Sequence, residues 1–220
     1  MFNTKDFVVL LLLVGLFLPF ILIPSWYHFF ESFTFHYPLL ASFIKFAVLA
    51  TWGESIGLRI RTGQYNYKGF GLLPRAVVWG FLGMGIYMAF VIFSQGTPAF
   101  LNAVVPGLGN YHIVLTAFAI STAMNLIFAP VMMTLHKITD THIINNGGRL
   151  AGLLKPIPFV HILKTMDWQT HWNFVLKKTI PLFWIPAHTI TFLLPEQFRV
   201  LFAAILGIVL GVILAFANKK

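Results

Sequence analysis

The chain has 220 residues, of which 58% are hydrophobic and 10% are charged. Soluble globular domains carry about 25% charged residues, so this composition excludes an ordinary water-soluble protein. The absence of cysteine excludes a disulfide framework and every thiolate-bound zinc or iron–sulfur centre. The net charge of +9 is attributed to membrane topology and not to nucleic acid binding, because the chain has little polar surface for a basic patch.

Hydrophobic segments of the length needed to cross a membrane recur along the chain. A bilayer core of roughly 30 Å takes about 20 apolar residues in a helix, because every backbone polar group must be bonded within the segment. The segment 7–23 has no small-residue cleavage site after it, so it is predicted to be a retained helix and not a signal peptide. The segment 179–194 is short and contains two prolines, and it is predicted to be a broken spanning helix. The predicted spans are 7–23, 39–58, 76–95, 111–133, 179–194 and 199–217.

The distribution of basic residues predicts the orientation of these spans. Of the 15 Lys and Arg, four lie between the second and third spans, six lie between the fourth and fifth, and three (Lys5, Lys219 and Lys220) lie near the chain ends. The connections 24–38 and 96–110 contain no Lys or Arg, and Arg199 is the one basic residue assigned to the side opposite these three groups. Six crossings with both termini on the positive, cytoplasmic-type side account for this asymmetry.

The sequence therefore predicts an all-α fold, a polytopic transmembrane helix bundle that forms a single domain over residues 1–220. The long connection 135–178 is predicted to contain a turn at 145–148 and a break at 155–158. After the break, an amphipathic helix with two tryptophans is predicted to lie at the membrane interface. The expected location is a bacterial inner membrane, or an organellar membrane if the source is a eukaryote.

The last predicted span carries small residues spaced four apart, namely Ala203, Gly207, Gly211 and Ala215. Helices in lipid associate largely through close packing of such residues. Gly53 and Gly57 in the second span offer a similar surface. These positions predict a tightly packed bundle; the alternative is a homo-oligomer formed through Gly207 and Gly211.

Lys45 and Glu54 are charged residues inside the predicted second span, where charge is costly and usually faces a cavity or a partner. At about 100° per residue, they project from opposite sides of the helix and cannot pair with each other. Two interpretations of Glu54 are open: it pairs with Arg61 near the basic membrane surface, or it faces a polar passage. Three roles are open for Lys45: it lines that passage, forms an ion pair with a carboxylate elsewhere, or extends toward the membrane surface.

The proline-containing segment points to a path for solutes. Pro181 and Pro186 each remove a backbone donor and free a carbonyl about four residues earlier. His188 and Thr191 follow within one turn of each other, and free carbonyls at membrane depth are tolerated mainly where protein or water covers them. The alternative is an ordinary kinked helix whose carbonyls are satisfied by neighbouring Ser and Thr.

The eight histidines form no recognisable metal-binding motif. His136 and His142 are six apart with Asp140 between them, and interfacial histidines in an aromatic belt explain this spacing better than a metal site. The sequence has no phosphate-binding glycine loop and no nucleophile elbow, and its six acidic residues leave little material for paired-carboxylate catalysis. We therefore expect no metal, no cofactor and no enzymatic activity.

Motifs in the region 50–217 follow a recurring order. Trp184 precedes His188-x-x-Thr191-Phe192, and Pro195-x-x-x-Arg199 opens the last span. Gly53-Glu54 and Asn125-x-x-x-Ala129-Pro130 occur earlier, and a glycine-rich helix ends at Tyr87. This order resembles the Mpv-seventeen and peroxisomal membrane protein two family.

The chain departs from that family's pattern at its polar positions. His188 stands where the family has Gln, Thr191 where it has Asn, Glu54 where it has Asp, and Met124 where it has the Asp before Asn125. The segment 7–23 resembles an addition to the family's pattern. The resemblance implies a distant, bacterial-type member and a small integral membrane protein that forms a weakly selective channel without an enzymatic cofactor.

The leading hypothesis is a passive channel for small solutes or ions. The expected partner is the lipid bilayer, and no nucleic acid is expected to bind. A non-conducting structural or assembly factor that binds partner helices is the alternative, and an intramembrane enzyme that acts on lipid or quinone through His188 is a third. Lys45 and Arg199 are expected to supply positive potential that favours anions. The candidate residues of the polar path are Lys45, Glu54, Asn125, His188, Thr191 and Arg199.

Overall fold

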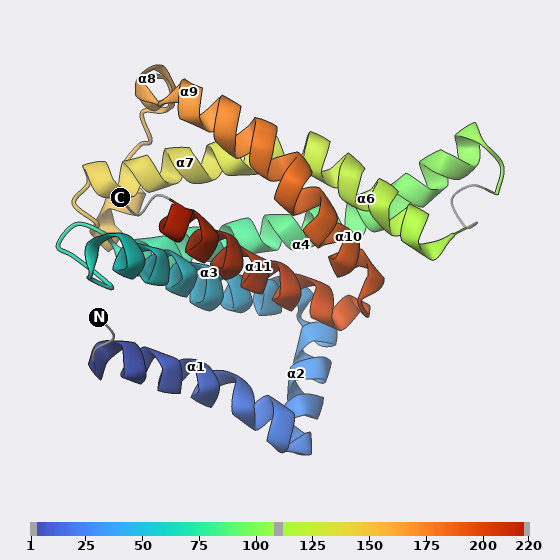
Figure 1. Ribbon diagram of the computed structural model, residues 1–220, viewed down its shortest axis with the longest axis horizontal. Coiled ribbons are helices and arrows are strands. Elements are labelled where there is room, and N and C mark those ends of the chain that lie inside the picture. The colour runs from blue at the N-terminus through green and yellow to red at the C-terminus, as the bar shows by residue number, and fades with distance from the viewer. Residues whose placement is uncertain (1–3, 108–111, 218–220) are drawn as a thin grey trace. The chain divides into compact units, whose positions relative to one another are not determined.

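The structure is a computed structural model that describes residues 4–107 and 112–217. These residues form helices and connecting turns and contain no strand (Figure 1), so the predicted all-α helix bundle is confirmed. The predicted start of the fourth span at Tyr111, and the terminal Lys219 and Lys220, lie outside the described residues. The chain groups into two compact units, Met1–Ala41 and Ser42–Lys220. The single domain predicted over residues 1–220 remains a prediction.

The first unit contains α1 (Thr4–Leu22) and α2 (Pro24–His36). Phe20 near the end of α1 packs edge-on against Trp26 and Phe30 of α2, with ring centroids 5.6 Å and 5.9 Å away. The sequence interpretation of 24–38 as a simple connection is corrected here, because most of it is helical. Pro24 lies in the first turn of α2, where its missing N–H would have no partner within the helix.

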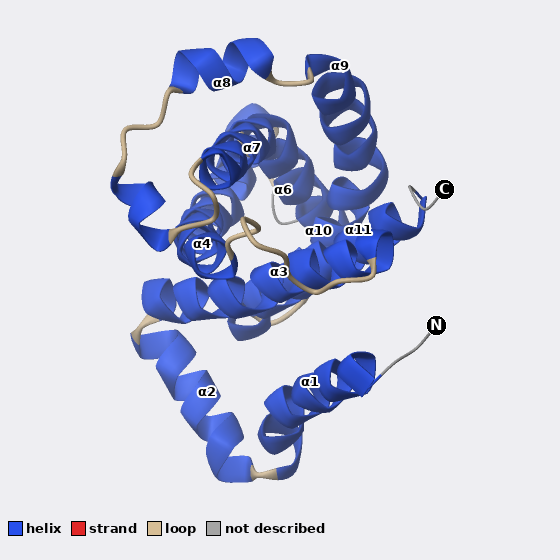
Figure 2. Cartoon of the chain, turned by 90° about the vertical axis from the view of Figure 1, so that its left-hand side faces the viewer, coloured by secondary structure: helices blue, strands red, loops and turns tan. Residues whose placement is uncertain are grey.

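The second unit contains the remaining long helices. They are α3 (Pro38–Thr62), α4 (Leu72–Val104), α6 (Ile113–Ile127), α7 (Ala129–Asn145), η2 (His171–Trp184), α10 (Ile185–Leu193) and α11 (Glu196–Ala217). In the end-on view of Figure 2, α3, α4, α7 and α11 are arranged around the centre of the bundle.

By length and composition, α1, α3, α4 and α11 are the described helices that can each cross a membrane. The pair α6 and α7 adds a fifth span if the two are taken together, although they meet at an angle of 45°. The chain therefore has the apolar helices of a membrane protein. The fifth predicted span, 179–194, lies within η2 and α10 except for Leu194, which follows α10, and its crossing remains a prediction.

The segment around the two prolines is helical and not interrupted. η2 is a π-helix of 14 residues that includes Pro181, and α10 continues it for 9 residues. Pro186 lies in the first turn of α10, where a missing N–H costs least. Thr189 Oγ1 donates to the Ile185 carbonyl at 2.8 Å, a bond from a hydroxyl to the carbonyl one turn earlier in the same helix.

The connection after α7 follows the predicted turn and break. Gly147 and Gly148 have φ of 65° and 66°, a left-handed conformation that favours glycine. A short 3-10 helix (Leu150–Leu154) precedes the irregular residues 155–158. In place of the single helix predicted there, the chain forms two short helices, α8 (Phe159–Thr165) and α9 (Trp168–Thr170). Trp168 of α9 and Trp172 of η2 are both exposed, and their position at a membrane interface remains a prediction.

Glycines bring the helices of the second unit close together. A Cβ added at Gly83 of α4 would lie 2.6 Å from Cβ of Phe46 in α3. A Cβ added at Gly53 of α3 would lie 3.0 Å from Cα of Ile208 in α11, and one added at Gly211 would lie 3.6 Å from the Gly53 carbonyl oxygen. These contacts match the tightly packed bundle. The predicted homo-oligomer through Gly207 and Gly211 remains a prediction.

Candidate functional site

The second unit contains a cavity of about 520 Å³ between α3, α4, α6, α7, η2, α10 and α11. Three of the six predicted path residues, Glu54, Asn125 and His188, line it. Along α4 the lining extends from Arg75 to Phe90, and 15 residues at 1.5 Å each correspond to about 22 Å of helix. The cavity therefore connects two groups of polar residues that lie far apart along the bundle.

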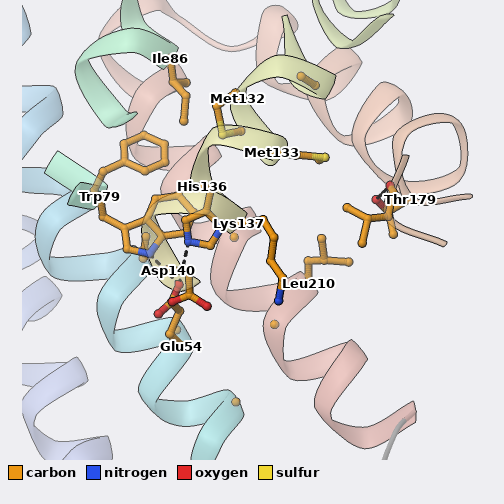
Figure 3. A pocket seen from close by; sticks show the side chains of 18 of the residues that line it. Glu54, Trp79, Ile86, Met132, Met133, His136, Lys137, Asp140, Thr179 and Leu210 are labelled. Atoms are coloured by element: carbon orange, nitrogen blue, oxygen red, sulfur yellow. Dashed lines mark hydrogen bonds and ion pairs between the residues drawn. The ribbon is translucent and has the colours of Figure 1, made fainter. Parts of the chain in front are cut away.

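Glu54 is the centre of the first group (Figure 3). Its Oε1 accepts hydrogen bonds from Trp79 Nε1 at 2.9 Å and from His136 Nε2 at 3.0 Å, and its Oε2 forms an ion pair with Arg75. Arg75 also forms an ion pair with Asp140 of α7. A single guanidinium thus pairs with two carboxylates that come from different helices, and these three groups together retain one negative charge.

Arg75 is held in place by the start of α4. The residue is 5% exposed, its Nε donates to the Phe70 carbonyl at 2.8 Å, and its guanidinium carbon lies 4.3 Å from the Phe70 ring centroid. Gly71 has a left-handed φ of 78° and turns the chain into the helix. The proposed pairing of Glu54 with Arg61 is corrected, because the arginine that neutralises Glu54 is Arg75.

Two other cations line the same end of the cavity. Arg61 at the end of α3 and Lys137 of α7 are exposed, and neither makes an ion pair with an acid among the described residues. In Figure 3 the side chain of Lys137 extends toward the α11 side of the cavity, which Leu210 marks. With Glu54 and Asp140 already paired to Arg75, this end of the cavity carries surplus positive charge.

The second polar group joins α6 to α10. Asn125 Nδ2 donates to the Ser121 carbonyl at 2.9 Å and lies 3.1 Å from His188 Nδ1, while Ser121 Oγ donates to the Ile185 carbonyl at 2.7 Å. Ser121 and Asn125 are both 0% exposed. The amide nitrogen and oxygen of Asn125 lie 3.1 Å and 3.4 Å from His188 Nδ1, so one of them can bond this ring nitrogen in either tautomer. His188 Nε2 makes no hydrogen bond within the described part of the chain.

Aromatic rings enclose His188 on two sides. The ring of Trp184 stacks on it with centroids 5.2 Å apart, and the ring of Phe90 meets it edge-on at 5.7 Å. The Trp184 Nε1 is buried without a hydrogen-bond partner in the described part of the chain. This end of the cavity therefore has an unpaired indole N–H, that of Trp184, next to the imidazole of His188.

The stretch between the two polar groups is apolar. Ile86 of α4, Phe128 between α6 and α7, and Met132 and Met133 of α7 line it. Methionine side chains are flexible and polarizable, so such a surface adapts to different apolar shapes.

The other three predicted path residues are not part of the cavity lining. Lys45 is half-buried elsewhere on α3, and Thr191 is 0% exposed and donates to the Ala187 carbonyl at 3.0 Å. Arg199 Nε donates to the Leu194 carbonyl at 3.0 Å, just after the end of α10. Cationic side chains commonly bind the last carbonyls of a helix, which accounts for this position.

Sequence reasoning missed four residues of the Glu54 group, and a spacing signal for them existed. Arg75 and Trp79 are four apart on α4, and His136 and Asp140 are four apart on α7. Residues at this spacing lie on the same face of a helix. Arg75, His136 and Asp140 were assigned to polar connections because the predicted third span starts only at Ala76 and the fourth ends at Met133, whereas both helices extend further. Trp79 lies inside the predicted third span and was not singled out.

Within residues 4–107 and 112–217, no group of three or more His, Asp or Glu residues could hold a metal ion. Comparison with protein-family models, with curated proteins and with solved structures gave no match. The resemblance to the Mpv-seventeen and peroxisomal membrane protein two family therefore remains a prediction from the residues alone. The fold and the cavity define the class of protein as an all-α membrane protein with an internal polar and apolar chamber.

Proposed function

We propose that this integral membrane protein provides a passive, weakly selective path for small solutes, with a preference for anions. The observation that carries the proposal is the cavity, whose lining follows α4 for about 22 Å of a bilayer core of roughly 30 Å. A chamber of this length leaves only a short barrier for a solute to pass.

The charges at the end of the cavity around Glu54 support the preference for anions. Arg61, Lys137 and Arg75 are three cations against the two carboxylates of Glu54 and Asp140, so this end keeps one positive charge. Rings of basic side chains select anions in pores because they lower the electrostatic cost of entry. The sequence contains no nucleotide-binding glycine loop that would couple transport to hydrolysis.

The barrier in this proposal is the junction of α6 and α10. The Asn125–His188 and Ser121–Ile185 hydrogen bonds and the rings of Phe90 and Trp184 close the far end of the cavity. A solute passes when these contacts separate, so His188→Ala is expected to raise flux and to alter ion preference.

The decisive test is a substitution on α11 that places a larger side chain in the cavity. Gly207 lines the cavity and an added Cβ meets no atom within 4 Å, so Gly207→Leu places a side chain in the chamber without a backbone clash. In liposomes that contain the purified protein, this variant is expected to lower anion flux by about tenfold, because the path becomes narrower. Gly96→Leu is the matched control, because Gly96 is an exposed, open position on α4 outside the cavity. Equal flux in wild type and Gly207→Leu, or no flux from well-folded wild type, would overturn the proposal in favour of a non-conducting structural factor.

A further inference from the structure

We propose that the cavity is a binding site for a single-chain amphipathic anion, such as a carboxylate with an alkyl chain. The charged group lies at the end lined by Arg61 and Lys137, and the chain lies along the methionines of α7. This inference names a ligand class for the path and rests on the proposed function in that both use the same cavity.

The polar end of the cavity requires a ligand with negative charge. Both acids that line this end pair with Arg75, and Glu54 also accepts hydrogen bonds from Trp79 and His136. With Arg61 and Lys137, three cations line this end against two carboxylates, so one positive charge remains. The charged groups left for a ligand are the guanidinium of Arg61 and the ammonium of Lys137, since neither pairs with a described acid. Cations and zwitterions gain less at such a site than anions.

The body of the cavity requires a ligand with apolar surface. Small-molecule sites typically have volumes of roughly 300–1,000 Å³ and are mostly apolar with a few placed polar groups, and this cavity, at about 520 Å³, has both properties. Met132, Met133 and Phe128 provide the apolar wall. A small inorganic anion would leave this wall in contact with water, whereas an alkyl chain covers it and gains the free energy of burial.

The far end of the cavity admits a terminal oxygen atom but does not require one. Trp184 Nε1 is a buried donor without a hydrogen-bond partner among the described residues, and Trp184 lines the same chamber. Buried donors that remain unpaired are rare and commonly mark a bound water or ligand. A chain with an oxygen at its end is therefore expected to bind more tightly than a plain chain of equal length.

Binding is measured on the full chain in nanodiscs of zwitterionic lipid, with decanoate brominated at its terminal carbon as the probe. Bromine quenches tryptophan fluorescence at short range, and Trp79 and Trp184 line the cavity. The expected result is saturable quenching that unlabelled decanoate reverses and that decyltrimethylammonium, a cation of equal chain length, reverses about tenfold less well. Trp184→Phe should remove much of the saturable signal, and Trp168→Phe, at an exposed position outside the cavity, should not.

Two sets of variants test the assignment. Gly207→Leu should abolish saturable quenching while Gly96→Leu retains it. If Gly207→Leu does not fold, Arg61→Gln combined with Lys137→Gln gives a second test. These two exposed substitutions should weaken decanoate binding by about five- to tenfold, because each removes a partly screened charge contact. Lys68→Gln combined with Lys155→Gln, at exposed sites outside the cavity, should leave binding unchanged.

The inference is overturned if quenching is unsaturable, if the cation competes as well as the anion, or if Gly207→Leu binds like wild type. Nanodiscs that contain phosphatidylglycerol distinguish a membrane lipid from a free carboxylate. Strong competition by this two-chain lipid would overturn the single-chain ligand. Flux without saturable decanoate binding would refute this inference and leave the path intact, whereas saturable binding without flux would refute the path and support this site.

Discussion

Arg75 carries its charge at a position that is almost fully withdrawn from solvent. Its guanidinium bridges Glu54 of α3 and Asp140 of α7, so a residue from α4 joins two other helices. A buried ion pair adds little net stability over an apolar pair of the same volume, but removal of one partner leaves an uncompensated charge. Removal of Arg75 would therefore destabilise the protein through Glu54 and Asp140, which would stay buried without their cation.

Arg75→Met is therefore expected to lower the free energy of unfolding by about 3–5 kcal/mol, since two carboxylates lose their cation. Denaturant titration in mixed micelles measures the change. Adding Glu54→Gln to Arg75→Met should restore part of the loss, because one of the stranded charges is removed. Arg149→Met, at an exposed site in the turn after α7, is the control and should change little. A loss for Arg75→Met no larger than the control's would contradict the bridging role.

Ion preference is expected to depend on the charges that line the cavity. Arg61→Gln and Lys137→Gln should each shift the reversal potential of the reconstituted protein toward cations in a potassium chloride gradient, because each removes positive potential from the entrance. Glu54→Gln should shift it toward anions. Lys155→Gln is exposed outside the cavity and should have no effect. The shifts should fade at high salt, where exposed charges are screened.

Part of this site could be predicted from the sequence and part could not. Glu54, Asn125 and His188 were found because polar residues inside apolar segments are costly and therefore conspicuous. Arg75, His136 and Asp140 were missed because they lie where hydrophobicity falls, and a polar run next to a span looks the same whether it is a loop or a helix that faces a cavity. Lys45 and Arg199 were assigned to the path because a charge in a span does not reveal which side of the helix faces the cavity.

The packing of α3 against α4 depends on glycines in α4. A Cβ at Gly83 would lie 2.6 Å from Cβ of Phe46, a distance that real Cβ contacts do not reach, whereas a Cβ at Gly85 would meet only Phe128 Cζ at 4.0 Å. The two glycines lie two residues apart on one helix, so helix propensity affects both alike. They differ in the neighbour that an added methyl group meets.

Gly83→Ala is expected to lower the free energy of unfolding by about 1–3 kcal/mol, because the overpacked contact forces α3 and α4 apart. Gly85→Ala should leave stability unchanged or raise it by roughly 0.5–1 kcal/mol, since alanine restricts the unfolded chain without a clash. Thermal inactivation of binding or flux in the same lipid provides the measurement. Equal stability of the two variants would refute the close approach of the helices.

The bend between α6 and α7 is an element that the hydrophobic pattern could not resolve. The pattern predicted one straight span over 111–133, but the helix turns by 45° at Phe128 and α7 continues to Asn145. Pro130, in the first turn of α7, offers no N–H to the preceding turn, which favours a break there. The bend places His136 and Asp140 against the cavity and not beyond the bundle.

At the level of the whole molecule, the positions of the long helices could be predicted, because crossing a membrane imposes a length and an apolar composition on each one. The boundaries of α3 and α11 lie within a few residues of those predicted. The arrangement of the helices could not be predicted, since lipid-exposed and protein-facing apolar residues look alike in a sequence. The sequence predicted that Gly53 and Gly211 are contact residues. It did not predict that Gly53 contacts the helix of Gly211 and Gly211 the helix of Gly53.

The orientation of the chain gives a prediction that labelling can test directly. The chain contains no cysteine, so every introduced cysteine is the sole reactive thiol. If both termini and the basic connections share one side, Thr4→Cys and Arg149→Cys should react with a membrane-impermeant maleimide only from the cytoplasmic face, and Val105→Cys only from the opposite face. Val105 is 48% exposed at the end of α4 and Arg149 is exposed after α7, so both sites are accessible. Arg149 and Thr4 on opposite faces would require an odd number of crossings between them, and η2 with α10 would then not need to cross for the basic C-terminus to lie on the side of Thr4.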